Sequence, residues 1–126
     1  MRVAVLRSPD DVRVEERDEP RIIEPTDAII RISTSCVCGS DLWDYRGINP
    51  GPKSTPMGHE YCGIVDEVGD AVTTIKPDHF VIGSFIASDN TCPHCRAGYH
   101  TACLHGEYVG AAGAQAEALR VPRRMT

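Results

Sequence analysis

Residues 89–113 form a long stretch with strong turn chemistry, little hydrophobic periodicity and three cysteines. A structureless run of about 25 residues is unusual in a compact domain unless it is functional or something besides hydrophobic packing organises it. Cys92 and Cys95 form a Cys-x2-Cys loop whose thiolates can reach one ion, and Cys103 adds a third soft ligand. This spacing is typical of zinc sites, so the sequence predicts a zinc-binding loop lobe over residues 89–105.

The fourth ligand of this lobe is less well defined. Zinc in structural sites prefers four ligands in a tetrahedron, and the suitable side chains nearby are Asp89, His94, His100 and His105. Asp89 precedes Cys92 by the same three-residue step that separates the first two lobe cysteines. Asp89 is therefore the first choice and His105 the second. Zinc binding at such a site contributes on the order of 10 kcal/mol to folding, which would order a glycine-rich lobe.

Two other interpretations of these cysteines stay open. The tetrapeptide from Cys92 to Cys95 has the form of a redox dithiol, as used by bacterial periplasmic disulfide oxidases. That chemistry needs a preceding strand and a helix that opens at the first cysteine, in a thioredoxin-like setting that the sequence does not show. Alternatively, the three lobe thiols are buried without a ligand, because free cysteine behaves as a small hydrophobe.

Composition narrows the fold and the function classes. The 126 residues suit one domain, and 11 Gly with 9 Pro favour a loop-rich, mainly β fold over a helical bundle. A net charge of −5 argues against nucleic-acid binding, which needs a basic face. No apolar run is long enough for a membrane span, and the N-terminus has no secretory pattern. We therefore expect a cytoplasmic protein whose six cysteines stay reduced.

Short β-like runs are spread along the chain. Residues 3–6 form one such run. After a polar turn, Val12 and Val14 alternate with charged residues in a second run, and the two runs together predict a hairpin. The isoleucine-rich run at 28–32 predicts a more buried strand, and residues 40–46 predict one or two helical turns. Further strands are expected at residues 63–68, 80–85 and 118–121.

A second group of chemistry-bearing residues lies in two short segments. Residues 38–41 read Cys-Gly-Ser-Asp and residues 58–60 read Gly-His-Glu, so together they offer one thiolate, one imidazole and two carboxylates. Cys38 and His59 are too few for a stable zinc site, because a catalytic zinc typically has three protein ligands and one open position. A third ligand would have to come from elsewhere. Taken alone, Cys38 reads as a core residue.

These motifs, in this order, resemble those of the zinc-dependent medium-chain alcohol dehydrogenases. The similarity rests on Cys-Gly-Ser-Asp at 38–41, on Gly-His-Glu-x2-Gly-x-Val-x2-Val-Gly at 58–69, on the cysteine lobe, and on Ala-Glu and Val-Pro at 116–117 and 121–122. It covers residues 1–122, which are expected to form one domain. The resemblance implies a mainly β, GroES-like β-barrel with a short helix and the zinc-binding loop lobe. In this family a second domain, of the Rossmann type, binds NAD(P).

The resemblance also implies a role for each residue of the second group. Cys38 and His59 would be ligands of a catalytic zinc, and Glu60 would lie beside the metal as a hydrogen-bonding carboxylate or an exchangeable ligand. Asp41 would accept the other ring N–H of His59 and fix its tautomer. Ser40 would hydrogen-bond the substrate hydroxyl and pass on its proton. A helix cap is the structural alternative for Ser40 and Asp41.

Two positions depart from the family pattern. The family's structural zinc lobe usually holds four cysteines, and here Asp89 takes the first of those positions. Some members carry a relay histidine where this chain has Trp43, which could instead line an apolar substrate pocket. The ligands expected in the lobe are Asp89, Cys92, Cys95 and Cys103, whereas the two cysteines expected in the core are Cys36 and Cys62.

The sequence shows no Rossmann domain, because no glycine-rich fingerprint follows a strand. We therefore expect residues 123–126 to be a non-family tail or truncation point, and we expect no hydride transfer from this chain alone. NAD(P) and a small alcohol or aldehyde would act only with the missing domain. The alternative is a stand-alone zinc-binding GroES-like interaction module or a truncated-gene remnant. The expected partner is a second copy or a separate Rossmann-domain chain, because a domain cut from its partner exposes apolar surface.

Overall fold

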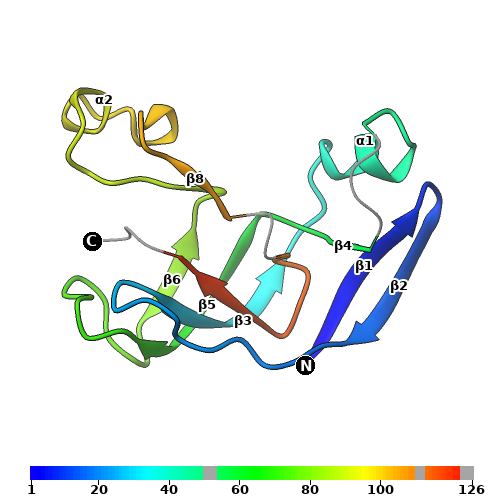
Figure 1. Cartoon of the computed structure of the whole chain (residues 1–126), viewed down its shortest axis with the longest axis horizontal. Helices are drawn as coiled ribbons and strands as arrows, with labels where there is room; N and C mark the ends of the chain where they lie inside the picture. Colours follow the sequence, from blue (N-terminus) through cyan, green and yellow to red (C-terminus); the bar gives the residue numbers. More distant parts are fainter. Residues whose placement is uncertain (50–53, 110–112, 123–126) are drawn as a thin grey trace.

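The computed structural model describes residues 1–49, 54–109 and 113–122 of the chain (Figure 1). The tail expected at 123–126 lies outside these residues. The helical elements are α1 (Asp41–Tyr45), α2 (Pro93–Arg96) and the 3-10 turn η1 (His100–Ala102). The strands are β1 (Arg2–Ser8), β2 (Asp11–Glu16), β3 (Ala28–Ser35), β4 (Thr55–Pro56), β5 (Tyr61–Val68), β6 (Phe80–Gly83), β7 (Ile86–Ala87), β8 (Glu107–Tyr108) and β9 (Ala118–Val121).

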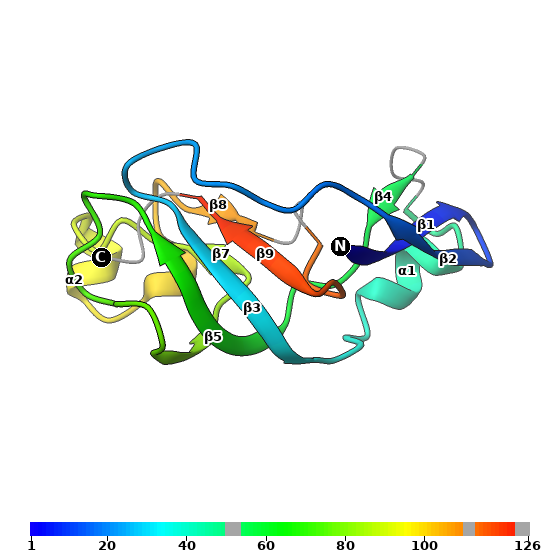
Figure 2. The same cartoon turned by 90° about the horizontal axis from the view of Figure 1, so that it is seen from below.

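The strands form three sheets, which confirms the mainly β prediction. Their orders are β2-β1-β4, β6-β5-β3-β9 and β7-β8. Within the described residues this pairing does not close into one continuous barrel. The β1–β2 hairpin and the lobe around α2 lie at opposite ends of the molecule (Figures 1 and 2). In the described part of the chain, no helix is long and apolar enough to cross a membrane.

The local predictions are confirmed where the side-chain pattern was strong. β1 and β2 pair antiparallel around a turn in which Asp10 has a positive φ of 62°, a conformation that aspartate tolerates better than most residues. Residues 28–30 of β3 are fully buried, as the isoleucine-rich run predicted. The strand expected at 80–85 is shorter than predicted, because β6 ends at Gly83 and the next strand, β7, starts only at Ile86.

Pairing of β3 with β5 builds the centre of the largest sheet. The two strands run antiparallel from Ala28↔Val68 to Ser35↔Tyr61, and irregularities interrupt their register after Ile29 and after Ile32. β-bulges of this kind bend a strand and re-aim its side chains, often beside functional sites. Since α1 follows β3 and residues 58–60 precede β5, this pairing brings the two segments of the second group to the same end of the sheet (Figure 2).

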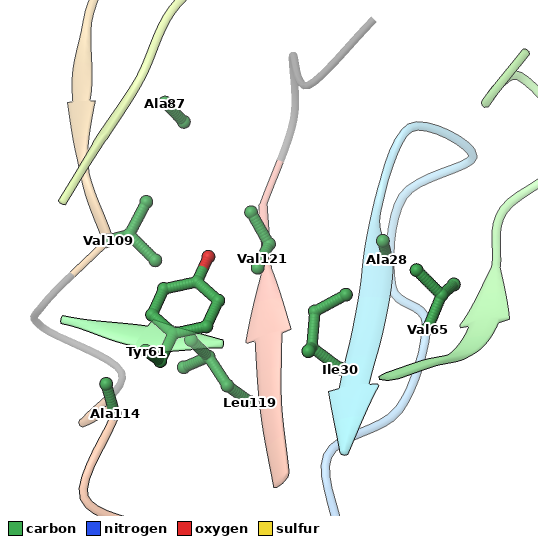
Figure 3. Close-up of a cluster of buried hydrophobic side chains, with 9 residues drawn as sticks. All are labelled: Ala28, Ile30, Tyr61, Val65, Ala87, Val109, Ala114, Leu119 and Val121. Atoms are coloured by element: carbon green, nitrogen blue, oxygen red, sulfur yellow. The ribbon is translucent and has the colours of Figure 1, made fainter. Parts of the chain in front are cut away.

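The hydrophobic core lies between this sheet and the segments that carry β7 and β8. Figure 3 shows the nine side chains of this cluster, with Val109, Leu119 and Val121 near the ring of Tyr61. That ring is 4% exposed, and burial raises the pKa of Tyr61 to about 12. Its hydroxyl has no hydrogen-bond partner among the described residues. The core residues are Ala28, Ile30, Tyr61, Val65, Ala87, Val109, Ala114, Leu119 and Val121.

Asp27 anchors the start of β3 from a fully buried position. Its Oδ2 atom accepts hydrogen bonds from the backbone N–H groups of Ile23 and Glu24, at 3.0 and 2.9 Å, and from Nη1 of Arg120 on β9 at 3.0 Å. The Asp27 side chain is 0% exposed, whereas that of Arg120 is 31% exposed. One carboxylate therefore ties the loop before β3 to the edge strand β9.

We expect Asp27→Ala to lower the free energy of unfolding by about 3 kcal/mol, because it leaves buried donors without their acceptor. Asp66→Ala is the matched control, because it breaks the 2.6 Å ion pair between Asp66 and Arg31. The side chains of Asp66 and Arg31 are 53% and 60% exposed. Exposed pairs contribute about 0–1 kcal/mol. Urea unfolding of both variants measures the difference, and equal losses would contradict the anchoring role of Asp27.

Candidate metal-binding sites

The two segments of the second group converge in the structure. One ligand atom each from Cys38, His59 and Glu60 lies within 4.8 Å of the others. Cys38 lies in the loop after β3, and His59 and Glu60 lie immediately before β5. The cluster therefore depends on β3–β5 pairing. A thiolate, an imidazole and a carboxylate form a donor set that suits zinc, so the residues present fit such an ion.

Ser40 and Asp41 surround the imidazole of His59. The Nδ1 atom of His59 lies 3.3 Å from Oδ1 of Asp41, and the two side chains are 9% and 8% exposed. The other carboxylate oxygen of Asp41 accepts the backbone N–H of Cys38 at 2.8 Å. The Oγ atom of Ser40 lies 3.3 Å from Nε2 of His59. With Nδ1 engaged by a carboxylate, Nε2 is the ring nitrogen that can face a metal.

The helix-cap alternative applies only in part. Ser40 occupies the N-cap position of α1, but its side chain makes no capping hydrogen bond. Its hydroxyl is directed to His59 instead. Asp41 is the first residue of α1, and its carboxylate binds back to the Cys38 backbone rather than along the helix. Both side chains therefore contact residues of the cluster instead of capping the helix.

Gly58 sets the backbone conformation immediately before His59. Its φ is +88°, and a Cβ atom there would lie 2.5 Å from Cγ and 2.8 Å from the backbone nitrogen of Gln115. The flanking backbone is held by hydrogen bonds of 2.9 Å from Ala114 N to Gly58 O and from Gln115 N to Met57 O. Glycine is required here because both the dihedral angle and the close approach exclude a side chain.

Two aromatic rings flank His59 and were not identified from the sequence. The ring centroids of Phe85 and Tyr108 each lie 6.1 Å from that of His59, at interplanar angles of 77° and 44°. Both come from short segments around β7 and β8 that carried no motif. Trp43, considered as a pocket residue, is 54% exposed on α1.

Hydrogen bonding favours the thiolate form of Cys38. The hydroxyl and backbone N–H of Ser40, together with His59, lower the pKa of the Cys38 thiol. Cys36 behaves differently, because its thiol donates to Oε2 of Glu60 at 2.9 Å and this contact raises its pKa. The prediction that Cys36 is a core residue is wrong, since it is exposed; Cys62 is half-buried. One irregularity of the β3–β5 register lies between Ile32 and Thr34, and Thr34 pairs with Cys62.

The lobe cysteines form a second, separate cluster with Asp89. The Sγ atom of Cys92 lies 3.5 Å from that of Cys95 and 3.9 Å from that of Cys103. The Oδ1 atom of Asp89 lies 3.6 Å from Sγ of Cys95 and 3.5 Å from Sγ of Cys103. Zinc with Zn–S near 2.3 Å and Zn–O near 2.0 Å gives tetrahedral edges of about 3.8 Å between sulfurs and about 3.5 Å between sulfur and oxygen. The residues present therefore fit a zinc ion.

Asp89 and His105 occupy different places in this lobe. One carboxylate oxygen of Asp89 faces the sulfurs and accepts the N–H groups of Thr91 and Cys92 at 2.9 and 3.1 Å. The other oxygen is bonded to Nδ1 of His105. This His105 contact is the largest cause that lowers the pKa of Asp89. The Asp89 side chain is 7% exposed and that of His105 is 60% exposed.

The lobe thiols differ in their tendency to ionise. Backbone N–H groups of Cys95 and Leu104 lower the pKa of Cys92, whereas burial raises the pKa of Cys95. Adjacent sulfurs ionise together only when a positive charge lies between them. A bound divalent cation would provide that charge.

The redox alternative finds little support in the lobe. Cys92 caps α2, but α2 has four residues and the strand before it, β7, has two. β7 pairs only with β8, and antiparallel. Within the described residues, these cysteines therefore lack the parallel βαβ surroundings of a thioredoxin-like dithiol. The convergence of Asp89 on the sulfurs likewise disfavours three thiols buried without a ligand.

Comparisons with known proteins show the family of this domain. The family model for the alcohol dehydrogenase GroES-like domain matches residues 24–126. The zinc-type alcohol dehydrogenase B of Aspergillus flavus is 38% identical over 97% of this chain, although the match covers 29% of that protein. The medium chain reductase/dehydrogenase ucsI of an Acremonium species is 36% identical over 97% of this chain and 43% of its own length.

Solved structures show the same relationship. Alcohol dehydrogenase TADH from Thermus sp. ATN1 aligns with a TM-score of 0.87 and 37% identity, covering 97% of this chain and 37% of that one. The zinc-dependent alcohol dehydrogenase 2 from Streptococcus pneumonia aligns with a TM-score of 0.85 and 35% identity, over 97% and 36% of the respective chains. The present chain thus spans well under half the length of these relatives, and it belongs to the alcohol dehydrogenase GroES-like domain family.

Proposed function

We propose that this chain is the zinc-binding catalytic half of an NAD(P)-linked alcohol dehydrogenase that interconverts a small alcohol and its aldehyde. The convergence of Cys38, His59 and Glu60 beside Ser40 carries the proposal, because it joins a zinc donor set to a group that can carry a proton. The nicotinamide cofactor would be bound by a Rossmann domain outside these residues, and a further metal ligand would also come from outside them. The free thiols that both sites require are consistent with a cytoplasmic setting.

Within this site each residue has a distinct task. Cys38 and His59 hold the ion, and Asp41 orients His59 by accepting its Nδ1–H. A zinc ion bound there supplies Lewis-acid polarisation of the substrate oxygen. Ser40, whose hydroxyl lies 3.3 Å from Nε2 of His59, hydrogen-bonds the substrate hydroxyl and takes part in moving its proton. Phe85 and Tyr108 provide apolar surface next to the imidazole.

The second ion is assigned a structural role at the lobe. Three thiolates and one carboxylate form a closed, four-ligand set, which leaves no position for a substrate. Asp89, Cys92 and Cys95 are buried, and Cys103 is half-buried. On this assignment His105 is a partner of the Asp89 carboxylate and is not a ligand. The alternative, a stand-alone zinc-binding interaction module, would need only this lobe.

We expect Cys103→Ser to abolish tight zinc binding and to lower the melting temperature strongly, because binding energy on the order of 10 kcal/mol acts as folding energy. Cys62→Ser is the matched control, since both thiols are half-buried and Cys62 lies outside both clusters. Cys38→Ser should hardly change the melting temperature. Metal analysis and thermal unfolding of the three variants decide the point, and similar small effects in all three would contradict a structural zinc.

The fourth-ligand assignment has a test of its own. If Asp89 binds the ion and His105 holds its other oxygen, Asp89→Ala should lose tight zinc, whereas His105→Ala should only speed zinc transfer to a chelator by about tenfold. His105→Gln, which keeps an N–H donor, should lie between His105→Ala and the unchanged chain. His100→Ala is the control, because His100 is an exposed histidine of the same lobe. Loss of zinc in His105→Ala with retention in Asp89→Ala would make His105 the ligand.

We expect the Rossmann domain to contact this chain at the exposed side of β6. Phe80 and Ile82 on this edge strand are 59% and 78% exposed, although both are apolar. We expect the chain to self-associate at high concentration through this surface, and Ile82→Lys to reduce that association. Light scattering measures it. A monomer at all concentrations, with no change in the variant, would argue against an unsatisfied interface here.

A further inference from the structure

Glu60 is held by two neighbouring residues at the end of β3. The hydroxyl of Ser35 donates to the backbone carbonyl of Glu60 at 3.0 Å, and the thiol of Cys36 donates to its carboxylate Oε2 at 2.9 Å. Both contacts continue the β3–β5 ladder, whose last pair is Ser35↔Tyr61. The next residues along each strand, Cys36 and Glu60, therefore face each other as a cross-strand pair.

This pair matters because Glu60 is the flexible member of the Cys38–His59–Glu60 cluster. His59 is oriented by Asp41 at Nδ1, whereas a glutamate has several rotatable bonds and gains entropy by leaving a site. The contact with Cys36 occupies Oε2. Among the described residues, Oε1 is then the carboxylate oxygen that has no hydrogen-bond partner and can turn to an ion.

Cys36 is well suited to donate this bond. Its Sγ atom lies 2.9 Å from Oε2 of Glu60, and a thiol can donate one hydrogen bond to a carboxylate oxygen. Its sulfur is not part of the group whose ligand atoms all lie within 4.8 Å of one another. Cys36 therefore contacts a member of the cluster without belonging to it.

We propose that Cys36 is a positioning residue for the candidate catalytic metal site, holding the Glu60 carboxylate at the ion through its S–H···Oε2 hydrogen bond. The inference rests on the proposed function, since it takes Cys38, His59 and Glu60 to hold a metal. Cys36 thereby acts in the site without binding the ion. Oε2 of Glu60 accepts the thiol, and Oε1 is left for the ion.

The test measures cobalt binding to the chain after zinc has filled the lobe. Co²⁺ gives a thiolate charge-transfer band and visible d–d bands that report the Cys38 site and its geometry. Cys36→Ala should weaken Co²⁺ binding about tenfold, as expected when the hydrogen-bond partner of a ligand is lost. Cys36→Ser, which keeps a donor, should restore most of the affinity. The charge-transfer intensity per bound ion should not change, because Cys36 is not a ligand.

Two controls keep the outcome specific. Cys62→Ala removes a thiol that lines the same cavity as Cys36 and Glu60 but makes no hydrogen bond to that carboxylate, and it should leave Co²⁺ affinity unchanged. In a Glu60→Gln background, the Cys36→Ala effect should become much smaller, because the charged acceptor is gone.

Three results would overturn the inference. Unchanged affinity in Cys36→Ala would show that the thiol does not position Glu60, while leaving the metal site itself intact. A drop in charge-transfer intensity would make Cys36 a ligand. If Cys38→Ser removes no Co²⁺ band, the proposed metal site is overturned, and the role of Cys36 with it.

Discussion

Antiparallel pairing of β3 with β5 is the interaction on which the rest of the molecule depends. It supplies Ile30 and Val65 to the core, and it carries β9 on one side and β6 on the other. The same pairing brings the loop that holds Cys38 to the turn that holds His59 and Glu60. Its irregular register before Thr34 changes which side chains meet at the end of the ladder. The candidate catalytic cluster is thus a product of strand pairing rather than of one local motif.

The cysteine lobe follows a different physical rule. Its helical pieces, α2 and η1, are too short to be stable on their own, and the sheet beside them has two strands of two residues. Hydrophobic burial is small here, and most lobe residues are exposed. What converges is a set of charged and soft ligand atoms at distances close to the edges of a zinc tetrahedron. Under the proposed assignment, a metal would take the place that a hydrophobic core has in the remainder of the fold.

Much of this could be anticipated from the sequence, for identifiable reasons. The hairpin strand at Val12 and Val14 was predicted correctly, although its valines are exposed rather than on a buried face. The isoleucines at 29 and 30 predicted a buried strand, and both are buried in β3. The spacing of Asp89 before Cys92 favoured Asp89 as the lobe's carboxylate, and the structure brings it to the sulfurs. Other features needed three dimensions. Phe85 and Tyr108 reach His59 from segments without a motif, and Cys36 meets Glu60 only because of the β3–β5 register.

X-ray absorption spectroscopy of the chain carrying one equivalent of zinc tests the central claim, that residues 89–103 are folded around an ion held by three thiolates and one carboxylate. The account predicts three sulfur neighbours at about 2.3 Å, one oxygen at about 2.0 Å and no multiple-scattering signal from imidazole. A shell with fewer than three sulfurs, or with a clear imidazole signal, would contradict it.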